Sequence, residues 1–377
     1  MTTLNVILDD MLTTAPGGSA RYTKELASAL IDYAPIGCFV EGIVAASTED
    51  EYRILAEQLP GLSGLFKSAL VRRDLTRAWQ HGFTSIPSGM LHAPTLFAPL
   101  RRHDRVNDRS TQVVVTIHDA VAWTHPDYLA PREVSWTKAM ALRTVKYADA
   151  VVVPTHAVAA ELDEILGLGE RVRVIGGAVG RGLVTPDDAD ERAERLGLPD
   201  RYVVTVGDSG PGHGIESLLV ALRNSSDSEL PLVVVGAERA EGALNAAIVA
   251  SGIDERRVTA LGTLDDADYA TTLSRATTLV YPGLGNGFGT PVLEAFGFGV
   301  PVIHAATPSL VEIAGDAGVP IEVDDADAFP GLLTEAIDRV AADPELRTTL
   351  SILGEDRAGL FTWRAVADGV WQLHADL

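Results

Sequence analysis

The chain has 377 residues, of which 46% are hydrophobic and 35 are glycine, so it can bury a large core and exceeds the length of one ordinary domain. Its formal net charge of -22 is uneven: residues 1–180 hold 17 Lys and Arg against 20 Asp and Glu, whereas residues 181–377 hold 13 against 32. An acidic protein of this kind is a poor partner for nucleic acid, because neutralising phosphates requires clustered cations.

Short β-branched runs alternate with amphipathic stretches along the chain, which is the pattern of parallel sheets flanked by helices. Strands are predicted at 4–8, 113–117, 150–153, 172–175, 202–206, 232–235, 278–281 and 300–303. Apolar residues at three- and four-residue spacing predict helices at 20–31, 134–147, 215–223, 240–250 and 266–275. A polar stretch at 185–195 separates the two sets. The sequence therefore predicts an α/β protein with two Rossmann-like, doubly wound domains, 1–180 and 181–360, that meet at a central cleft beside the carboxyl ends of both sheets.

The chain shows neither a leader-like segment nor an uncharged apolar stretch of about 18 residues, so we expect a cytoplasmic protein with at most peripheral contact at the inner face of a membrane. The single cysteine, Cys38, has no partner for a disulfide or a zinc site and is expected to be a small core residue. A local basic run is expected to form a solvated face in preference to a surface for an anionic acceptor or membrane headgroups. It comprises Lys67, Arg72, Arg73, Arg77, Arg101, Arg102, Arg105 and Arg109.

A glycine-rich turn follows the strand predicted at 278–281. It passes through four glycines and enters a predicted helix at Pro291, since proline is favoured at the first helical position. Free backbone N–H groups at such a helix end bind phosphate or a developing anion, and glycines let the ligand approach closely. Glu294, in the predicted first turn, is favoured by the helix dipole and could accept hydrogen bonds from a sugar diol. An ordinary βα turn with an N-terminal charge accounts for these features equally well.

This turn resembles the donor-binding motif of the GT4 family of retaining glycosyltransferases, which have the GT-B fold and in which two glutamates flank seven residues that include Gly-Phe-Gly and Pro. Here Glu294 corresponds to the second glutamate and Asn286 replaces the first. The resemblance implies that Glu294 holds the nucleotide ribose and that Asn286 stands where a carboxylate meets donor-sugar hydroxyls. The amides expected to meet the sugar and the diphosphate are those of Gly287, Phe288, Gly289 and Thr290.

The resemblance covers nearly the whole chain. Gly17 and Gly18 precede a predicted helix and are similar to the family's first-domain glycine loop, which implies contacts from the loop backbone to the diphosphate and from Arg21 and Tyr22 to the acceptor. Residues 361–363 are similar to the Phe-Ser-Trp that starts a terminal helix in the family, which implies that residues 361–377 cross back onto the first domain.

His118 follows a predicted strand and, with Asp119, resembles the family's strand-end His-Asp pair. The resemblance implies that His118 contacts the donor sugar near the reacting carbon, which places it with Asn286 and Glu294 in the predicted catalytic set. The alternative is a histidine that is only satisfied by hydrogen bonds at a strand end.

The chain departs from the family in the loop that begins at Gly207. The family usually places an arginine and a lysine there to offset the diphosphate charge, and this pair aligns with Gly212 and His213, with Asp208 adding a negative charge. Losing a buried cationic partner typically costs several kcal/mol. Backbone amides of the loop, a protonated His213, or a cation from Arg21 or Arg239 could compensate.

The sequence therefore predicts a metal-independent, retaining hexosyltransferase whose partners are a nucleotide diphosphate sugar and a hydroxyl acceptor, either lipid-linked or a small metabolite. No divalent metal is expected, because no Asp-x-Asp pair occurs in a suitable loop, and no cofactor is expected beside the nucleotide sugar. A homodimer is compatible with the sequence. A catalytically impaired GT-B partner subunit and a phosphorylase-like enzyme that uses free phosphate are the alternatives. A dinucleotide-dependent oxidoreductase ranks low, because neither the Gly17 loop nor the Gly207 loop reads as Gly-x-Gly-x-x-Gly.

Overall fold

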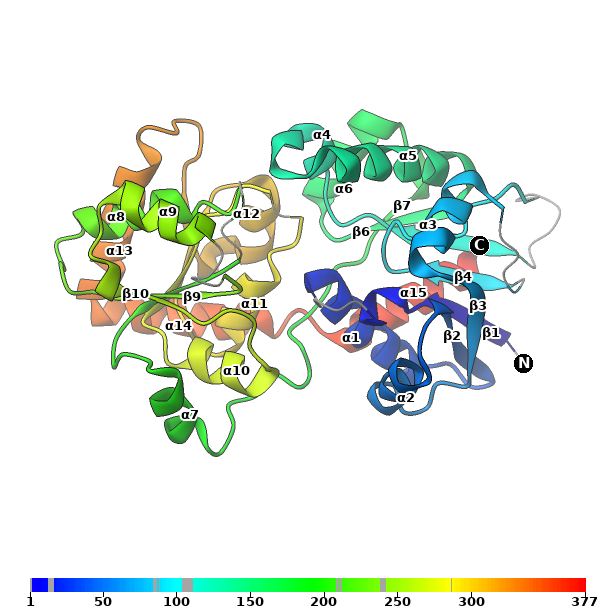
Figure 1. The fold of residues 1–377 in the computed structure, drawn as a ribbon, viewed down its shortest axis with the longest axis horizontal. Helices are drawn as coiled ribbons and strands as arrows, with labels where there is room; N and C mark the ends of the chain where they lie inside the picture. Colours follow the sequence, from blue (N-terminus) through cyan, green and yellow to red (C-terminus); the bar gives the residue numbers. More distant parts are fainter. Residues whose placement is uncertain are drawn as a thin grey trace. The chain divides into compact units, whose positions relative to one another are not determined.

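The structure is a computed structural model that describes residues 2–12, 17–83, 87, 89–103, 111–207, 210, 212–237, 242–285 and 287–377. The chain divides into two compact units (Figure 1). Unit 1 comprises Met1–Ala178 and Thr362–Leu377, and unit 2 comprises Val179–Phe361. These limits lie within two residues of 180 and 360, the boundaries drawn from the sequence.

Unit 1 contains a seven-stranded parallel sheet of order β3-β2-β1-β4-β5-β6-β7. Its strands are β1 (Thr2–Ile7), β2 (Cys38–Ala46), β3 (Gly64–Val71), β4 (Met90–Ala93), β5 (Gln112–Thr116), β6 (Ala150–Val153) and β7 (Val172–Val174). All residues of β5 and β6 are buried, as is usual for parallel strands that are covered by helices on both faces.

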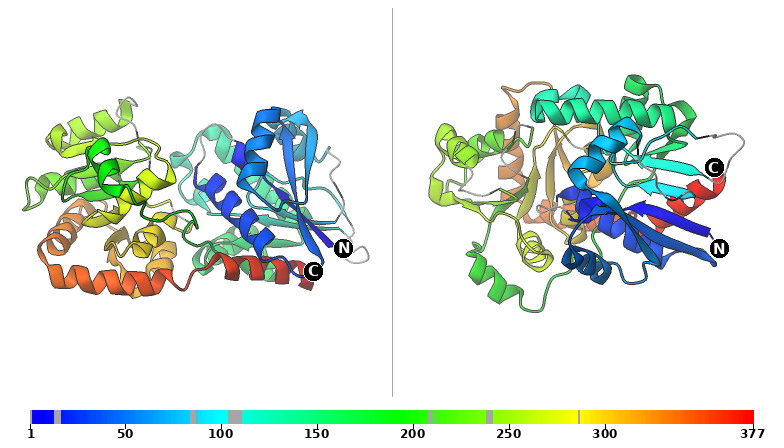
Figure 2. Two further views of the ribbon diagram at one scale, coloured as in Figure 1. Left: turned by 90° about the horizontal axis from the view of Figure 1, so that it is seen from below. Right: turned by 45° about the vertical axis from the view of Figure 1, so that its right-hand side comes forward.

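Helices cover both faces of this sheet (Figure 1). They are α1 (Gly18–Asp32), α2 (Glu49–Gln58), α3 (Arg72–His81), α4 (Val121–Thr124), α5 (Pro131–Tyr147), α6 (His156–Leu166) and α15 (Trp363–Asp376). One apolar core joins the sheet to α3, α5 and α6. The last helix of the chain, α15, lies beside α1 (Figure 2), where the Trp371 indole N–H donates to the Leu30 carbonyl at 3.2 Å.

Unit 2 contains a six-stranded parallel sheet of order β10-β9-β8-β11-β12-β13. Its strands are β8 (Val203–Val206), β9 (Leu232–Val235), β10 (Val258–Ala260), β11 (Thr278–Tyr281), β12 (Val302–Ala305) and β13 (Val319–Ile321). Its helices are α7 (Ala189–Leu196), α8 (Ile215–Asn224), α9 (Gly242–Ser251), α10 (Asp266–Ser274), α11 (Thr290–Gly297), α12 (Pro308–Ala314), α13 (Phe329–Ala342) and α14 (Pro344–Ala358).

The strand order of each sheet reverses at one point. In unit 1 the chain runs outward from β1 to β3 and then returns to β4, and in unit 2 it runs outward from β8 to β10 and returns to β11. The connections that leave the two central strands therefore diverge to opposite faces and open a crevice at the carboxyl edge, which is where doubly wound sheets bind ligands. The topology singles out the loops after β1 and β4 and the loops after β8 and β11.

The α/β prediction is confirmed, and β6, β9 and β11 have the predicted bounds. The strand predicted at 300–303 begins instead at Val302. The Val300 N–H donates to Ala295 at the end of α11, and Pro301 has no N–H to give to a neighbouring strand. The prediction that Cys38 is a core residue was wrong, because it lies partly exposed at the start of β2.

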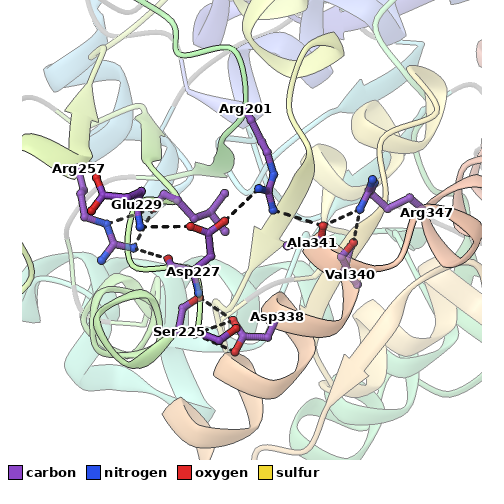
Figure 3. Close-up of polar contacts among 11 residues, drawn as sticks. Arg201, Ser225, Asp227, Glu229, Arg257, Asp338, Val340, Ala341 and Arg347 are labelled. Atoms are coloured by element: carbon purple, nitrogen blue, oxygen red, sulfur yellow. Dashed lines mark hydrogen bonds and ion pairs between the residues drawn. The ribbon is translucent and has the colours of Figure 1, made fainter.

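A polar network occupies the opposite edge of the second sheet, where the strands begin (Figure 3). Arg201, just before β8, forms an ion pair with Asp227 at 3.0 Å, and Asp338 of α13 accepts a hydrogen bond from Ser225 at 2.6 Å. Arg257 donates to the carbonyl groups of three residues in the same region. These contacts fix the amino edge of the sheet and leave the carboxyl edge as the place for a ligand.

Candidate functional site

Three loops of unit 2 meet at the carboxyl edge of its sheet, backbone against backbone. The Leu284 N–H, after β11, donates to the Gly212 carbonyl, after β8, at 2.8 Å. Gly214 has φ +71°, and a Cβ there would lie 2.6 Å from the Pro282 carbonyl oxygen. Gly236, after β9, has φ +98°, and a Cβ there would lie 3.2 Å from the Gly207 carbonyl oxygen. A Cβ at Gly214 would collide with the Pro282 backbone and one at Gly236 would crowd Gly207, so the glycines let the three loops approach closely at the point where the strand order reverses.

The His213 ring lies close to Gly207, the first residue of the β8–α8 loop. Gly207 has φ +147°, and a Cβ there would lie 2.6 Å from the imidazole Nδ1 of His213. The ring is partly buried, as is Gly212 beside it. Asp208 and Arg239, which the sequence placed near this loop, lie outside the described residues. Among the residues of the β8–α8 loop that the structure describes, His213 is thus the one with an ionisable side chain.

The helix after β11 begins one residue earlier than predicted. Gly289, at φ +73°, precedes α11, whose first residue is Thr290 and whose second is Pro291. Glu294 is therefore the fifth residue of α11, and the prediction that it lies in the first turn was wrong. Because the field of a helix end falls off within the first turn, the dipole contributes little to holding this carboxylate.

Glu294 is fully buried among apolar neighbours of α11, with 0% of its surface exposed. Its Oε2 accepts a hydrogen bond of 2.7 Å from the hydroxyl of Tyr269 on α10. Burial, and to a lesser extent the charge of Glu294, raises the pKa of Tyr281 at the end of β11. The carboxylate is therefore hydrogen-bonded to Tyr269 and close enough to Tyr281 to affect its pKa.

The loop residues before α11 are held by packing. The ring of Phe288 lies edge-on against Phe361 with ring centroids 6.1 Å apart, and a Cβ on Gly289 would lie 2.4 Å from the Leu310 side chain. Gly287 and Thr290 flank these two residues and are partly buried. Asn286 lies outside the described residues. The segment thus presents its backbone from a fixed position at the head of α11.

The glycine loop of unit 1 is exposed. Gly17 and Gly18 stand at the beginning of α1, and the Gly17 carbonyl accepts hydrogen bonds from Ala20 at 3.1 Å and from Arg21 at 3.2 Å. A Cβ on either glycine would meet no heavy atom of the structure within 4 Å. Packing within unit 1 therefore does not explain why glycine occupies these two positions. Arg21, in the first turn of α1, is partly buried.

His118 lies just beyond β5, at the carboxyl edge of the sheet of unit 1. Its Nε2 contacts the Pro94 carbonyl oxygen, after β4, at 2.8 Å, and since a carbonyl oxygen can only accept, Nε2 carries the proton. Burial lowers the pKa of His118, and it outweighs the Pro94 hydrogen bond and the nearby carboxylates of Asp119 and Asp10, which favour the charged form. The ring is therefore neutral near pH 7, and Nδ1 is its hydrogen-bond acceptor.

Tyr22 supports His118 from the side of α1. The two rings are 4.8 Å apart in an edge-on arrangement, and the Trp363 ring at the start of α15 lies 5.9 Å from Tyr22 on another side. The Tyr22 hydroxyl is buried, and burial raises the pKa of this phenol. The structure thus gives Tyr22, which the sequence assigned to acceptor binding, a packing contact with the predicted catalytic histidine.

Two family models match the chain. Residues 16–180 match a model described as "Glycosyltransferase Family 4", and residues 200–343 match one described as "Glycosyl transferases group 1". The first match falls on unit 1 and the second on unit 2. The chain belongs to glycosyltransferase family 4.

Individual relatives of this family 4 glycosyltransferase agree. The O-antigen chain mannosyltransferase B of Escherichia coli is 25% identical over 285 residues, which cover 72% of this chain and 70% of the relative. Longer E. coli proteins, the serotype-specific mannosyltransferases WbdA, are matched over 21–22% of their length.

Solved structures establish the GT-B fold. The Thermosynechococcus elongatus sucrose-phosphate synthase has a TM-score of 0.72 at 20% identity and covers 100% of this chain and 99% of its own. The Anabaena Alr3699/HepE protein, crystallised in complex with UDP and glucose, has a TM-score of 0.73 at 17% identity and covers 100% of both chains.

The sequence did not single out one polar cluster of the glycosyltransferase's unit 1. Arg72 of α3 forms ion pairs with Asp9 and Asp10 in the loop after β1, and Asp10 accepts a hydrogen bond of 2.9 Å from Thr95 in the loop after β4. Arg72, which the sequence placed on a solvated basic face, keeps 41% of its side chain exposed, but its guanidinium is paired with these two aspartates. Two consecutive aspartates directly after a buried strand were the available signal.

The structure brings the predicted residues together in two groups. His118 and Tyr22 lie together in unit 1, and Gly207, Gly212 and His213 lie in the loop that contacts the β11–α11 loop in unit 2. None of the helices in the described part of the chain is long and apolar enough to cross a membrane. Among the same residues, no group of three or more His, Cys, Asp or Glu side chains is placed to hold a metal ion.

Proposed function

We propose that this family 4 glycosyltransferase moves a hexose from a nucleoside diphosphate sugar to a hydroxyl acceptor with retention at the anomeric carbon. The observation that carries the proposal is the backbone contact between the loops after β8, β9 and β11, together with the buried carboxylate of Glu294 on α11, the helix that follows one of these loops. Backbone N–H groups at the crevice of a doubly wound sheet suit a diphosphate, and a carboxylate beside them suits the ribose diol.

The reaction breaks the bond between the anomeric carbon and the diphosphate and forms a bond from that carbon to the acceptor oxygen on the same face of the sugar. The acceptor proton passes to the departing diphosphate, so the charges balance. The loop amides and the N-terminus of α11 stabilise the charge that develops on the diphosphate. Asn286 and the amides of 287–290 hold the sugar, and neutral His118 offers its Nδ1 to a sugar hydroxyl. No divalent cation takes part in the proposed reaction.

The names of similar proteins support a hexose donor. The E. coli relative is a mannosyltransferase that acts on O-antigen chains, and the Anabaena structure holds UDP and glucose. We propose a hexosyl nucleotide as donor and a glycan or lipid-linked glycan hydroxyl as acceptor, with Arg21 at the acceptor side of the exposed Gly17–Gly18 loop.

Thermal unfolding with a panel of nucleoside diphosphates and their hexose derivatives tests donor binding. A ligand at a hundred times its Kd adds about 2.7 kcal/mol of stability, which corresponds to a rise in Tm of about 5–10 °C for a unit of this size. The protective nucleotide is then supplied as its sugar together with glycan acceptors, and NMR of the product establishes the anomeric configuration. Absence of protection by every nucleotide would refute the proposal.

A binding or partner subunit without transferase activity is the competing function. It is favoured by the presence of Gly212 and His213 where the family usually has an arginine and a lysine. The two functions differ in turnover: product formation by the isolated chain excludes the subunit, whereas nucleotide protection without turnover on any acceptor supports it.

A further inference from the structure

The buried hydrogen bond between Tyr269 and Glu294 joins two helices that lie on the same side of unit 2. Tyr269 is 2% exposed and Glu294 is 0% exposed, so water cannot replace the bond of 2.7 Å between the phenol and Oε2. The bond connects α10 to α11, which is the helix that begins at the proposed donor loop. Any displacement of Tyr269 therefore acts on the carboxylate.

Glu294 needs a donor of this kind. It is the fifth residue of α11, beyond the free N–H groups of the helix end, and its neighbours Leu293 and Ala295 are buried apolar residues. A buried carboxylate is strongly disfavoured unless it is hydrogen-bonded, and its three side-chain torsions allow more than one orientation. The phenol of Tyr269 supplies a bond and selects one orientation of the carboxylate.

The chemical type of the donor matters as much as its position. The neighbouring carboxylate on α10, Asp268, is bound by Arg192 at 2.7 Å and by Arg195 at 2.6 Å, and is thereby neutralised. The hydrogen bond from Tyr269 to Glu294 comes instead from a neutral phenol, which orients the carboxyl group without adding a positive charge beside it. Carboxylate oxygens that accept hydrogen bonds are what a ribose diol requires.

The helix that carries Tyr269 is itself anchored on two sides. The ion pairs of Asp268 tie α10 to α7, and the hydroxyl of Tyr202 donates to the Thr272 carbonyl of α10 at 2.6 Å. Tyr269 is therefore presented from a rigid support.

We propose that Tyr269 is a positioning residue, which orients the Glu294 carboxylate to receive the ribose diol of the donor nucleotide. The inference rests on the proposed function, and it adds a residue on a helix outside the glycine loops. Its signature is discrimination between a ribonucleotide and the corresponding 2′-deoxyribonucleotide, because the deoxy form lacks one hydroxyl of the diol.

The experiment compares Tyr269→Phe with Tyr202→Phe in the full chain. Each variant removes the hydroxyl of one buried tyrosine. Tyr269 donates to Glu294, whereas Tyr202 donates to the Thr272 carbonyl of α10 and therefore serves as the matched control. Kd is measured by calorimetry for the nucleoside diphosphate that protects the wild type and for its 2′-deoxy analogue, and Tm is recorded for each protein. Glu294→Gln and the double variant Tyr269→Phe/Glu294→Gln complete the set.

We expect the wild type to prefer the ribonucleotide by about tenfold or more, as is usual for a hydrogen bond to a charged group. Tyr269→Phe should lose most of this preference, Tyr202→Phe should keep it, and the double variant should discriminate no worse than Glu294→Gln alone. Tyr269→His, which retains a donor on a smaller ring, should recover part of the preference and stands in if Tyr269→Phe does not fold.

The outcomes separate this inference from the function on which it rests. Binding of no nucleotide by the wild type refutes the proposed function. Nucleotide binding with equal affinity for the ribo and deoxy forms overturns the inference alone. It is also overturned if Tyr269→Phe discriminates as well as Tyr202→Phe while Glu294→Gln does not, because Tyr269 would then serve only stability.

Discussion

Replacement of Gly214 by alanine should destabilise unit 2 and weaken nucleotide binding together. Gly214 precedes α8 with φ +71°, and the new Cβ would lie 2.6 Å from the carbonyl oxygen and 2.9 Å from the carbonyl carbon of Pro282. Both atoms belong to the backbone of the β11–α11 loop, so no side-chain rotation of a neighbouring residue can make room for the new methyl group. The two proposed donor loops must move apart.

The magnitude follows from two separable costs. A left-handed conformation costs a residue with a Cβ about 1–2 kcal/mol, and relieving an overpacked contact costs about 1–3 kcal/mol more. We therefore expect Gly214→Ala to lower the free energy of unfolding by about 2–5 kcal/mol. A loop displacement of several tenths of an ångström should also raise the Kd of the protective nucleotide, because the N–H groups that meet the diphosphate come from both loops.

Two other glycines of unit 2 separate these costs. Gly197, at the end of α7, has φ +66° but no atom within 4 Å of its Cβ position, and Gly331 in α13 has neither a positive φ nor a neighbour. Gly197→Ala should lose about 1–2 kcal/mol, and Gly331→Ala should gain about 0.4–1 kcal/mol, both with unchanged Kd. Urea unfolding and calorimetric titration measure the two quantities. A Gly214→Ala protein that matches Gly197→Ala in both would refute the reasoning.

Three further predictions concern charged groups. Glu294→Gln should leave Tm unchanged or higher, because burying a charge is costly, yet weaken nucleotide binding; loss of both would indicate a structural role. Burial lowers the pKa of His92 to about 3 and that of His374 well below 6.5, so these rings are neutral when folded and bind protons when unfolded. The free energy of unfolding should therefore fall as the pH drops below 6.5, by about 1.4 kcal/mol per pH unit for each of the two groups. His92→Leu should reduce this dependence of stability on pH. Equal urea midpoints at pH 7.5 and 5.0 would contradict the prediction. His213→Lys should tighten diphosphate binding more at low than at high salt, whereas unchanged affinity would show that the β8–α8 loop does not meet the diphosphate.

The sequence could predict the fold because its strands are short, apolar and bounded by polar residues. Residues 150–153, 232–235 and 278–281 were placed correctly, since each run is buried on both faces and has no competing pattern. Where a local hydrogen bond competes with the sheet, as at Val300, the hydrophobic run overstates the strand. The start of α11 was predicted one residue too late, because proline is acceptable at the second helical position as well as at the first.

The candidate site could be predicted only where it is local in sequence. The glycine turns carry their own signal, because positive φ and close backbone approach require glycine. The contacts that define the environment of the functional side chains are not local: Tyr269 is 25 residues from Glu294, and Arg72 is 63 residues from Asp9. Nothing in the spacing of those residues reveals these contacts, so the ion pairs of Arg72 were not predicted and Tyr269 was not considered.

The departure at Gly212 and His213 changes how unit 2 would have to bind a diphosphate. Residues 179–361 contain no lysine, and arginines such as Arg195, Arg201 and Arg275 are engaged with Asp268, Asp227 and Asp190. Among the described residues of this unit, backbone N–H groups and His213 would then be the groups that meet the negative charge of a bound diphosphate, and Arg239 lies outside the described residues. Backbone dipoles are effective only when their geometry is fixed in advance. This requirement gives a physical reason for three loops packed through glycines, and it makes loop geometry, more than side-chain charge, the quantity on which donor binding depends.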